Sequence, residues 1–197
     1  MHISDIVEIA KITFLNNIAI SRNDKALIKF VQLGVSELYR RFNLSIKSET
    51  ITTSTNLTLY ELKNQDVSLL LGVFDRTGRE LKETDVMDSR TFEYKMVNYK
   101  SFLLRNPFDG LLYAVYKASP SKALENLEDY IELPDAMMDA LLTYVAYIGH
   151  STINKDNINE ASAYLQRFDI ACKELEMQGY RIPLSTESLS LHAKGFV

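Results

Sequence analysis

The chain has 197 residues, of which 46% are hydrophobic, so it is long enough to enclose at least one sizeable core. Its formal net charge is −4, which leaves no general excess of cations for phosphates or for an anionic membrane surface. The single cysteine excludes an intramolecular disulfide, and no apolar stretch approaches the roughly 20 residues that span a bilayer.

Two helices are predicted in the first 44 residues. The first runs from Ser4, the expected N-cap, to about Leu15, with Asp5 in its first turn. The second runs from about Asp24 to Phe42, because apolar residues recur there every three or four positions, the period of a core-facing helical stripe. The residues expected on the apolar sides of the two helices are Ile6, Ile9, Ala10, Thr13, Leu27, Val31, Val35, Leu38 and Phe42.

The pattern changes after residue 45, where short runs of β-branched and aromatic residues replace the helical period. The segment 75–78 (DRTG) has the composition of a hairpin turn, since its glycine adopts a left-handed conformation at little cost. The pairs 106–107 (NP) and 109–110 (DG) indicate a second tight reversal. These signals predict a small, mainly antiparallel sheet or sandwich. Its expected strands are Ile46–Thr53, Leu57–Leu62, Val67–Phe74, Tyr94–Val97, Phe102–Arg105 and Leu111–Lys117.

Two further helices are predicted after Pro120. Pro134 is placed in the first turn of the third helix, where its missing N–H would have no intrahelical partner. Asn157 and Glu160 form a candidate capping pair for the fourth helix, and Gly179 supplies its C-terminal stop. The third helix is expected to face the core with Met138, Leu141, Leu142, Val145 and Ile148, and to carry Asp135, Asp139 and Thr143 on its other side. The fourth is expected to face the core with Ala161, Tyr164, Leu165, Phe168, Ala171, Cys172 and Leu175.

The order of these elements predicts an α+β protein. Amphipathic helices need one another to bury their apolar stripes, so we expect one four-helix bundle with the β-rich region inserted between its second and third helices. The expected divisions are residues 1–44 for the first part of the bundle, 45–120 for the β-rich insertion, 121–179 for the second part of the bundle, and 180–197 for an extended C-terminal tail.

The sequence offers little material for catalysis. It has no Walker-type or dinucleotide-binding glycine loop, and none of His2, His150 and His192 belongs to a zinc-binding spacing. Asp135 and Asp139 lie one helical turn apart, but acidic residues early in a helix usually serve solvation and the helix dipole. We therefore expect no metal, no cofactor and no enzymatic activity.

Other reactive or aromatic residues also have plain structural interpretations. His150 is expected near the end of the third helix, bonded to its last carbonyls, and Cys172 is expected to be a buried, inert thiol. The pair Arg40-Arg41 suits the C-terminal end of a helix dipole. The tyrosines could provide a stacking platform for single strands, but sheet packing and subunit contacts are favoured for Tyr94, Tyr99, Tyr113 and Tyr116.

Four segments carry a resemblance to a known family: residues 73–81 (VFDRTGREL), 114–120 (AVYKASP), 131–151 (IELPDAMMDALLTYVAYIGHS) and 159–175 (NEASAYLQRFDIACKEL). They resemble, in this order, the hairpin, the strand exit, the third helix and the following helix of tailed-bacteriophage head-to-tail adaptors, also described as portal–tail connectors or tail tubular protein A-like ring subunits. The resemblance covers about the last two thirds of the chain. It depends on the order of the elements as much as on the residues.

The resemblance implies a structural subunit of the virion that is made in the host cytoplasm and then lies at the head-to-tail junction. Family members typically assemble as a ring of twelve copies below the portal, complete the DNA-filled head, and recruit the tail or nozzle protein. Genomic DNA would pass through the lumen without specific binding, and no membrane is involved. By this resemblance, portal docking is assigned to Tyr180, Arg181, Ile182, Leu184, Leu189, Leu191 and Phe196, and a tail-facing hairpin to Asp75, Arg76, Thr77 and Gly78.

Three alternatives remain open at this stage. The chain could be another neck or tail-completion ring protein of the virion. It could be a small cytoplasmic enzyme whose site combines, for instance, His150 with Asp139. It could be a regulatory DNA-binding protein that uses its helical pair as a helix-turn-helix, although the acidic charge balance disfavours this. For the C-terminal tail, a disordered terminus is the alternative to a docking segment.

Overall fold

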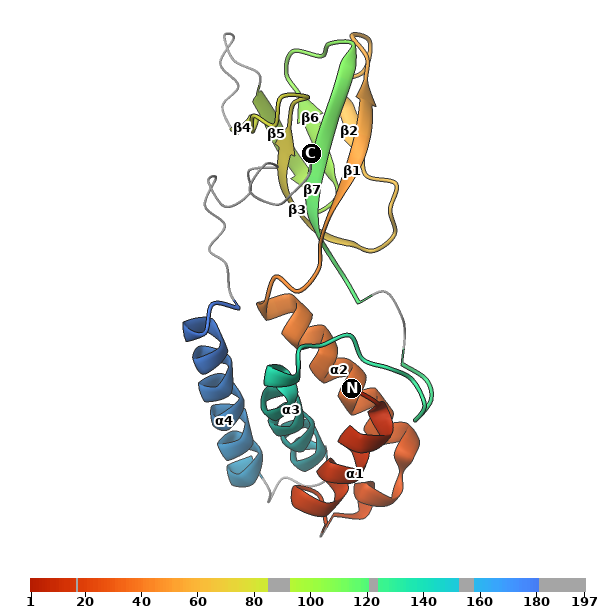
Figure 1. Ribbon diagram of the computed structural model, residues 1–197, viewed down its shortest axis with the longest axis vertical. Coiled ribbons are helices and arrows are strands. Elements are labelled where there is room, and N and C mark those ends of the chain that lie inside the picture. The colour runs from red at the N-terminus through yellow and green to blue at the C-terminus, as the bar shows by residue number, and fades with distance from the viewer. Residues whose placement is uncertain (17, 85–92, 121–123, 153–157, 181–197) are drawn as a thin grey trace. The chain divides into compact units, whose positions relative to one another are not determined.

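The computed structural model describes residues 1–16, 18–84, 93–120, 124–152 and 158–180, and these residues form an α+β fold with four α-helices and two sheets (Figure 1). Contacts divide them into two units, named here the helical unit (residues 1–44 and 124–180) and the strand unit (residues 45–120). The α-helices are α1 (Ile3–Thr13), α2 (Asp24–Arg41), α3 (Met138–Ser151) and α4 (Ile158–Met177), with short 3₁₀ turns at Ala19–Arg22 and Asp135–Met137. The strands are β1 (Ile46–Thr53), β2 (Leu59–Glu61), β3 (Val67–Phe74), β4 (Lys82–Glu83), β5 (Glu93–Asn98), β6 (Ser101–Leu104) and β7 (Gly110–Ala118).

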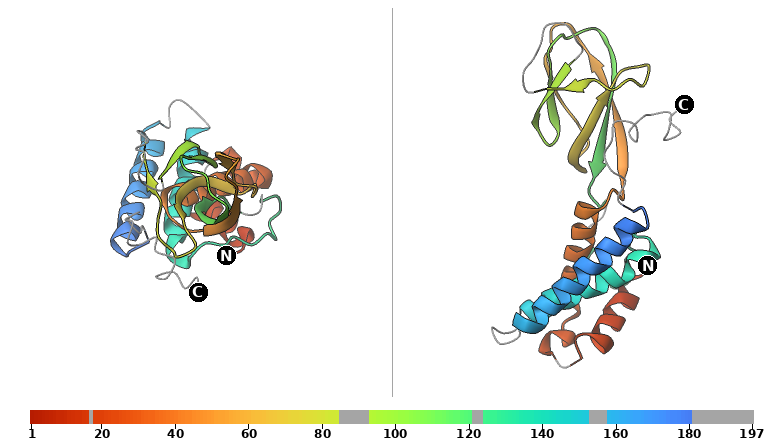
Figure 2. Two further views of the ribbon diagram at one scale, coloured as in Figure 1. Left: turned by 90° about the horizontal axis from the view of Figure 1, so that it is seen from above. Right: turned by 90° about the vertical axis from the view of Figure 1, so that its left-hand side faces the viewer.

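The helical unit is arranged around α3, which packs against α2 on one side and α4 on the other. Helices α3 and α4 run side by side in Figure 1 and in the right view of Figure 2. Gly34 of α2 permits a close approach to α3, because a Cβ atom at this position would come within 2.6 Å of Cδ1 of Leu141. The predicted α2 stripe is confirmed. Its members, each at most 4% exposed, are Leu27, Val31, Val35, Leu38 and Phe42.

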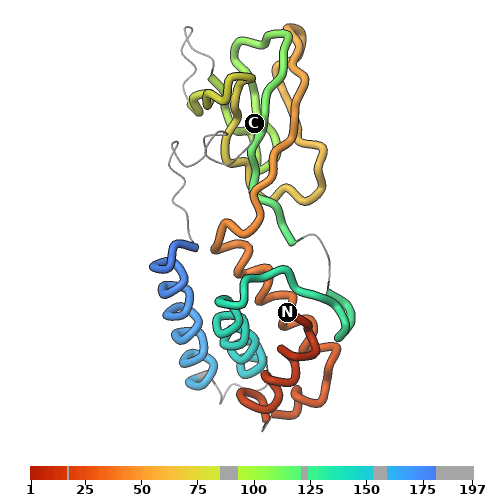
Figure 3. Tube along the Cα trace, in the orientation of Figure 1, coloured from red at the N-terminus to blue at the C-terminus, as the bar shows by residue number. Residues whose placement is uncertain are grey.

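A segment without regular structure, residues 124–134, lies along the helices before α3 begins. Figure 3 shows this segment near the start of the chain. Two hydrogen bonds join them: the amide of Ile3 donates to the carbonyl of Asp129 at 3.1 Å, and the amide of Ser4 donates to that of Leu127 at 2.9 Å. The hydroxyl of Tyr39 on α2 donates to the carbonyl of Glu132 at 3.1 Å. These bonds fix a loop that would otherwise need water to satisfy its polar backbone.

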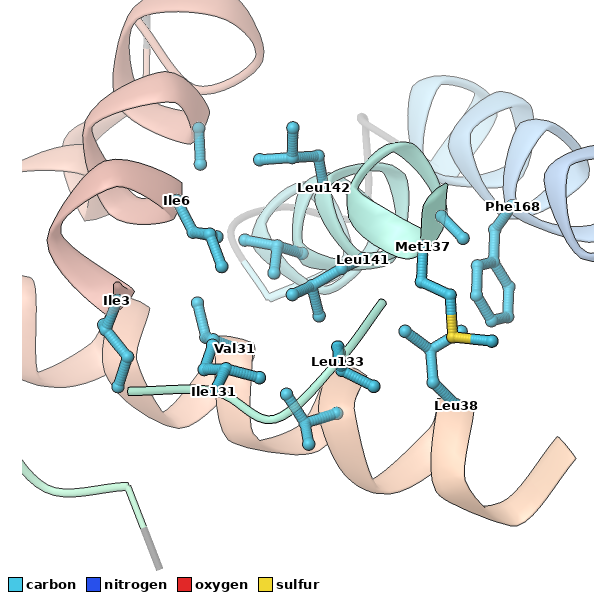
Figure 4. Packing of buried hydrophobic residues seen from close by; sticks show 14 of the residues in the cluster. Ile3, Ile6, Val31, Leu38, Ile131, Leu133, Met137, Leu141, Leu142 and Phe168 are labelled. Carbon is cyan, nitrogen blue, oxygen red and sulfur yellow. The ribbon is translucent and has the colours of Figure 1, made fainter. Parts of the chain in front are cut away.

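The core of the helical unit draws apolar side chains from all four helices and from the segment before α3. Each such side chain contributes roughly 1.5–3 kcal/mol when it is fully removed from water. Figure 4 shows this packing, with Leu133 and Ile131 of the loop segment filling the space beside α2. Its labelled members, all buried, are Ile3, Ile6, Val31, Leu38, Ile131, Leu133, Met137, Leu141, Leu142 and Phe168.

Helix α3 is buried on more sides than its sequence pattern indicated. Thr143, predicted on the polar side, is only 4% exposed. Its hydroxyl is satisfied within the helix, because it donates to the carbonyls of Asp139 at 2.9 Å or Ala140 at 3.0 Å. A helix enclosed by neighbours needs no polar face except where it meets solvent, and a threonine can satisfy its hydroxyl locally.

Helix α4 ends in a Schellman motif, as the predicted glycine stop suggested. Gly179 has a φ of 88°, its amide donates to the carbonyl of Glu176 at 3.0 Å, and the amide of Tyr180 donates to that of Leu175 at 3.1 Å. The Tyr180 side chain packs partly buried against the helical core. Tyr180, the first residue of the expected extended tail, thus packs with the helical unit, and the rest of that tail lies outside the described residues.

The helix starts differ from the predictions. The N-cap of α1 is His2, without a side-chain cap, while Ser4 lies inside the helix with its hydroxyl 3.3 Å from Asp5 Oδ1. Thr13 is exposed at the end of α1, not on its apolar side. Pro134 precedes the 3₁₀ turn that leads into α3, so the α-helix itself begins only at Met138. Asn157 lies outside the described residues, so the proposed capping pair stays a prediction.

The strand unit consists of a three-stranded antiparallel sheet in the order β1-β7-β3 and a four-stranded sheet in the order β2-β6-β5-β4. All pairings are antiparallel except the short parallel contact of β4 with β5. The mainly antiparallel prediction is therefore confirmed. The second predicted reversal, at residues 106–110, carries the chain from β6 in one sheet to β7 in the other. Strand β4 was not predicted, because two exposed charged residues carry no strand pattern.

The two sheets share one hydrophobic core, which is separate from that of the helical unit. Phe102 at its centre is fully buried, with ring centroids 5.8 Å from Tyr60 and 5.9 Å from Tyr94. Tyr116 is also buried, whereas Tyr99 is 52% exposed. The tyrosines singled out in the sequence therefore divide between core packing and the surface.

Candidate functional sites

The turn that follows β3 is built around the carboxylate of Asp75. Its Oδ1 accepts hydrogen bonds from the amide of Thr77 at 2.8 Å, the hydroxyl of Thr77 at 2.6 Å and the amide of Arg79 at 3.0 Å. Gly78 has a φ of 82°, which confirms the predicted left-handed residue. Phe74 and Glu80 form an antiparallel bridge across the turn. The segment is therefore a tight, preorganised turn that presents Arg76 to solvent.

Hydrogen bonding keeps Asp75 ionised. Burial alone would raise the pKa of this carboxyl, but bonds from the Thr77 hydroxyl and from the amides of Arg79 and Thr77 outweigh burial and hold the pKa below its ordinary value of 3.8. The turn geometry consequently persists at neutral pH. Whether its tip contacts a tail protein stays a prediction.

The predicted portal-docking residues fall into two groups. Tyr180 is part of the helical unit, where it packs against the core. The other residues assigned to docking lie outside the described part of the chain, and their role stays a prediction. They are Arg181, Ile182, Leu184, Leu189, Leu191 and Phe196.

His150 lies between three elements of the helical unit. The prediction that it bonds the last carbonyls of α3 is wrong. Its Nε2 instead lies 3.1 Å from the carbonyl oxygen of Phe14. A hydrogen bond at this position requires the proton on Nε2, because a carbonyl only accepts. Its Nδ1 lies 2.9 Å from Oε2 of Glu160 on α4, and its ring packs 4.9 Å from that of Tyr164. The imidazole thus joins the end of α1 to α3 and α4.

A cavity of about 500 Å³ opens beside His150. Its described lining contains one histidine, one carboxylate and the hydroxyl of Thr13, but no serine or cysteine. Asp139 is not part of it. That residue lies 11 positions earlier on the same helix, about 16 Å along the axis at 1.5 Å per residue. The pair His150 and Asp139, considered as a catalytic combination, is therefore not assembled.

Arg41 has a role that the helix-dipole interpretation missed. Its Nε lies 2.8 Å from Oε1 of Glu37 and its Nη1 2.8 Å from Oδ1 of Asp169, so it joins α2 to α4. The guanidinium also stacks over Phe168, with Cζ 4.5 Å from the ring centroid. Cys172 nearby is buried as predicted, and burial raises its pKa to about 11, so the thiol remains protonated and unreactive at neutral pH.

The strand unit contains a carboxyl cluster that the sequence did not indicate. Oε2 of Glu80 is buried and has no hydrogen-bond partner within the described residues. Burial raises the pKa of Glu80 above its ordinary value of 4.5, and the charge of Glu83 raises it further. Burial also raises the pKa of Tyr94, with Glu83 and Glu80 adding to the effect. No sequence signal marks this cluster, because tertiary packing creates the burial.

Replacing Glu80 by glutamine is expected to stabilise the strand unit at neutral pH. An acid whose pKa is raised on folding binds its proton more tightly in the folded state, so its ionisation lowers stability as the pH rises above 4.5. The gain should be at most about 1 kcal/mol, because solvent screens a partly exposed carboxylate. Chemical denaturation of Glu80→Gln and wild type at pH 4 and pH 8 measures it. An equal difference in stability between Glu80→Gln and wild type at both pH values would contradict the prediction. Glu83→Gln is the comparison and should stabilise the strand unit less.

Two other kinds of site are absent from the described ranges. No group of three or more His, Cys, Asp or Glu side chains there is arranged to hold a metal ion. None of the helices in these ranges combines the length and the apolar character needed to cross a membrane. Asp135 and Asp139, the acidic pair considered for a cation, are both exposed.

Neither a scan against protein-family models nor a search of curated proteins found a match for this chain. Three features of the described residues bear on function: the preorganised turn at Asp75, the two separate cores, and the arrangement of charges on the helical unit.

Proposed function

We propose that this protein is a head-to-tail adaptor of a tailed bacteriophage. In this interpretation the helical unit is a four-helix bundle, and the strand unit is an insertion between its second and third helices. Copies of the chain form a ring, typically of twelve, beneath the portal. The ring completes the DNA-filled head and recruits the tail or nozzle protein.

The observation that carries the proposal is the chain order of the two units. Residues on both sides of the strand unit, 1–44 and 124–180, contribute to a single helical core. This order matches the resemblance noted in the segments 73–81, 114–120, 131–151 and 159–175. Separate cores give each unit its own rigid surface, and a closed ring requires two different surfaces on every subunit.

The charge of the chain also supports this role. A ring around DNA that must slide past it should not bind phosphates tightly, and a net charge of −4 favours weak contact. In the proposed ring the turn at Asp75 faces the tail and the residues after Tyr180 contact the portal. A neck or tail-completion ring subunit is the alternative within the same class, distinguished by failure to bind the portal directly.

The proposed portal contact predicts a selective binding defect. Leu189→Asp combined with Leu191→Asp should weaken binding to the portal protein of the same genome by about tenfold or more, since each leucine buried at an interface contributes more than about 1.4 kcal/mol. Cosedimentation of full-length protein with portal rings measures the affinity. Arg76→Glu in the exposed turn is the matched control and should leave portal binding unchanged. Absence of binding by the wild-type chain would exclude the adaptor function.

A further inference from the structure

One stretch of the helical unit is rich in exposed carboxylates, and the cation beside it among the described residues is the N-terminal ammonium of Met1, 3.2 Å from the carbonyl oxygen of Ile131. Between Leu124 and Asp139 the chain has no lysine or arginine. None of the exposed carboxylates in this stretch forms an ion pair with another described residue. They are Glu125, Glu128, Glu132, Asp135 and Asp139, and are named here the acidic surface.

The acidic surface is rigid. Its backbone is held by hydrogen bonds to the first residues of α1 and to the hydroxyl of Tyr39, and its apolar residues Ile131 and Leu133 are buried in the core. Tyr130, which lies among the carboxylates, is 60% exposed. Fixed like charges repel one another, so a surface of this kind is stabilised by a partner that brings cations and covers the tyrosine.

Helix α2 carries the complementary surface. Four exposed residues, separated by four, four and seven positions, lie on one side of this helix: Lys25, Lys29, Leu33 and Arg40. Leu33 near the middle is 51% exposed. Glu37 pairs with Arg40 and Arg41, and Asp24 pairs with Lys11, so the excess positive charge of this side comes from Lys25 and Lys29. The four exposed residues are named here the basic surface.

We infer that the basic surface of one copy binds the acidic surface of a second copy. This inference rests on the proposed ring, for which it names the contact between neighbouring subunits. Carboxylates outnumber cations on the acidic surface, lysines dominate the basic surface, and each has an exposed Tyr130 or Leu33, so the two are complementary in charge and each has apolar area to bury. Nucleic acid is a poorer occupant of the basic surface, because the unit around it is acidic and offers few cations to phosphates.

Charge reversal tests the inference. The first variant, Lys25→Glu with Lys29→Glu, reverses the basic surface, and the second, Glu128→Lys with Glu132→Lys, reverses the acidic surface. Sedimentation velocity of the full chain at low ionic strength should show concentration-dependent association of the wild type, weakened by 0.5 M salt. Each variant alone should associate at least tenfold more weakly. An equimolar mixture of the two, and a chain carrying all four changes, should recover association.

Lys63→Glu with Lys173→Glu is the matched control, since it changes the net charge as the first variant does but alters exposed lysines elsewhere. It should associate as the wild type does. The inference would be overturned if both reversed variants associated as the wild type does, or if their mixture did not recover association. It would also be overturned if the wild-type chain remained monomeric under all conditions. If the wild type binds the portal but the charge reversals leave self-association unchanged, only the proposed subunit contact is wrong. If association follows the charges but portal binding is absent, only the adaptor function fails.

Discussion

Replacing Phe168 by alanine is expected to lower the free energy of unfolding of the helical unit by about 3–5 kcal/mol. Phe168 is fully buried on α4, its ring lies 4.8 Å from that of Tyr144 on α3, and it supports the guanidinium of Arg41 from α2. Truncation therefore leaves a cavity and removes the platform of an ion-paired arginine.

Hydrogen exchange measured by mass spectrometry checks this prediction. Peptides from α3 and α4 should lose protection in Phe168→Ala, and chemical denaturation should give the size of the loss. Ile170→Ala is the matched control, because Ile170 lies two residues away on the same helix but is 55% exposed. It should change stability by less than about 0.5 kcal/mol. Equal effects of the two substitutions would show that α4 is not anchored through Phe168.

Replacing Phe102 by alanine is expected to destabilise the strand unit by a similar amount, about 3–5 kcal/mol. Phe102 is fully buried on β6 and contacts the rings of both Tyr60 on β2 and Tyr94 on β5. Loss of its ring removes two aromatic contacts in addition to the buried area. Exchange in peptides from β2, β5 and β6 should increase.

Leu59→Ala provides the control for Phe102→Ala. Leu59 lies on the neighbouring strand β2, pairs with Leu103 across the sheet, and is 49% exposed. Its truncation should cost less than about 1 kcal/mol, because little buried area is lost. A loss in Leu59→Ala as large as that in Phe102→Ala would place the core of this unit elsewhere.

The elements with strong local patterns were predictable from the sequence. Helix α2 follows its apolar stripe from Leu27 to Phe42, and strands β1 and β3 have the predicted bounds. For α2 the helical period determines which residues are buried, whereas β3 was recognisable from its run of apolar residues, because register shifts interrupt its alternation. The Asp75 turn was also predictable, since its glycine and its aspartate act within a few residues of one another.

Features that depend on tertiary packing were not predictable. Thr143 is buried because α3 is surrounded, and Arg41 is paired because α4 lies within its reach. His150 bonds to Phe14, which is far away in the sequence. The helical charge pattern of α2 indicates its basic surface, but the position of the acidic surface is known only from the folded unit. Local patterns alone contain none of these neighbours.

Cryo-electron microscopy of the neck of the particle whose genome encodes this chain tests the adaptor function most directly. The proposal predicts a ring of copies directly beneath the portal, with helical density at the portal and each subunit fitted by the helical and strand units described here. Particles in which the portal contacts the tail without such a ring, or in which this chain is absent from the neck, would contradict it.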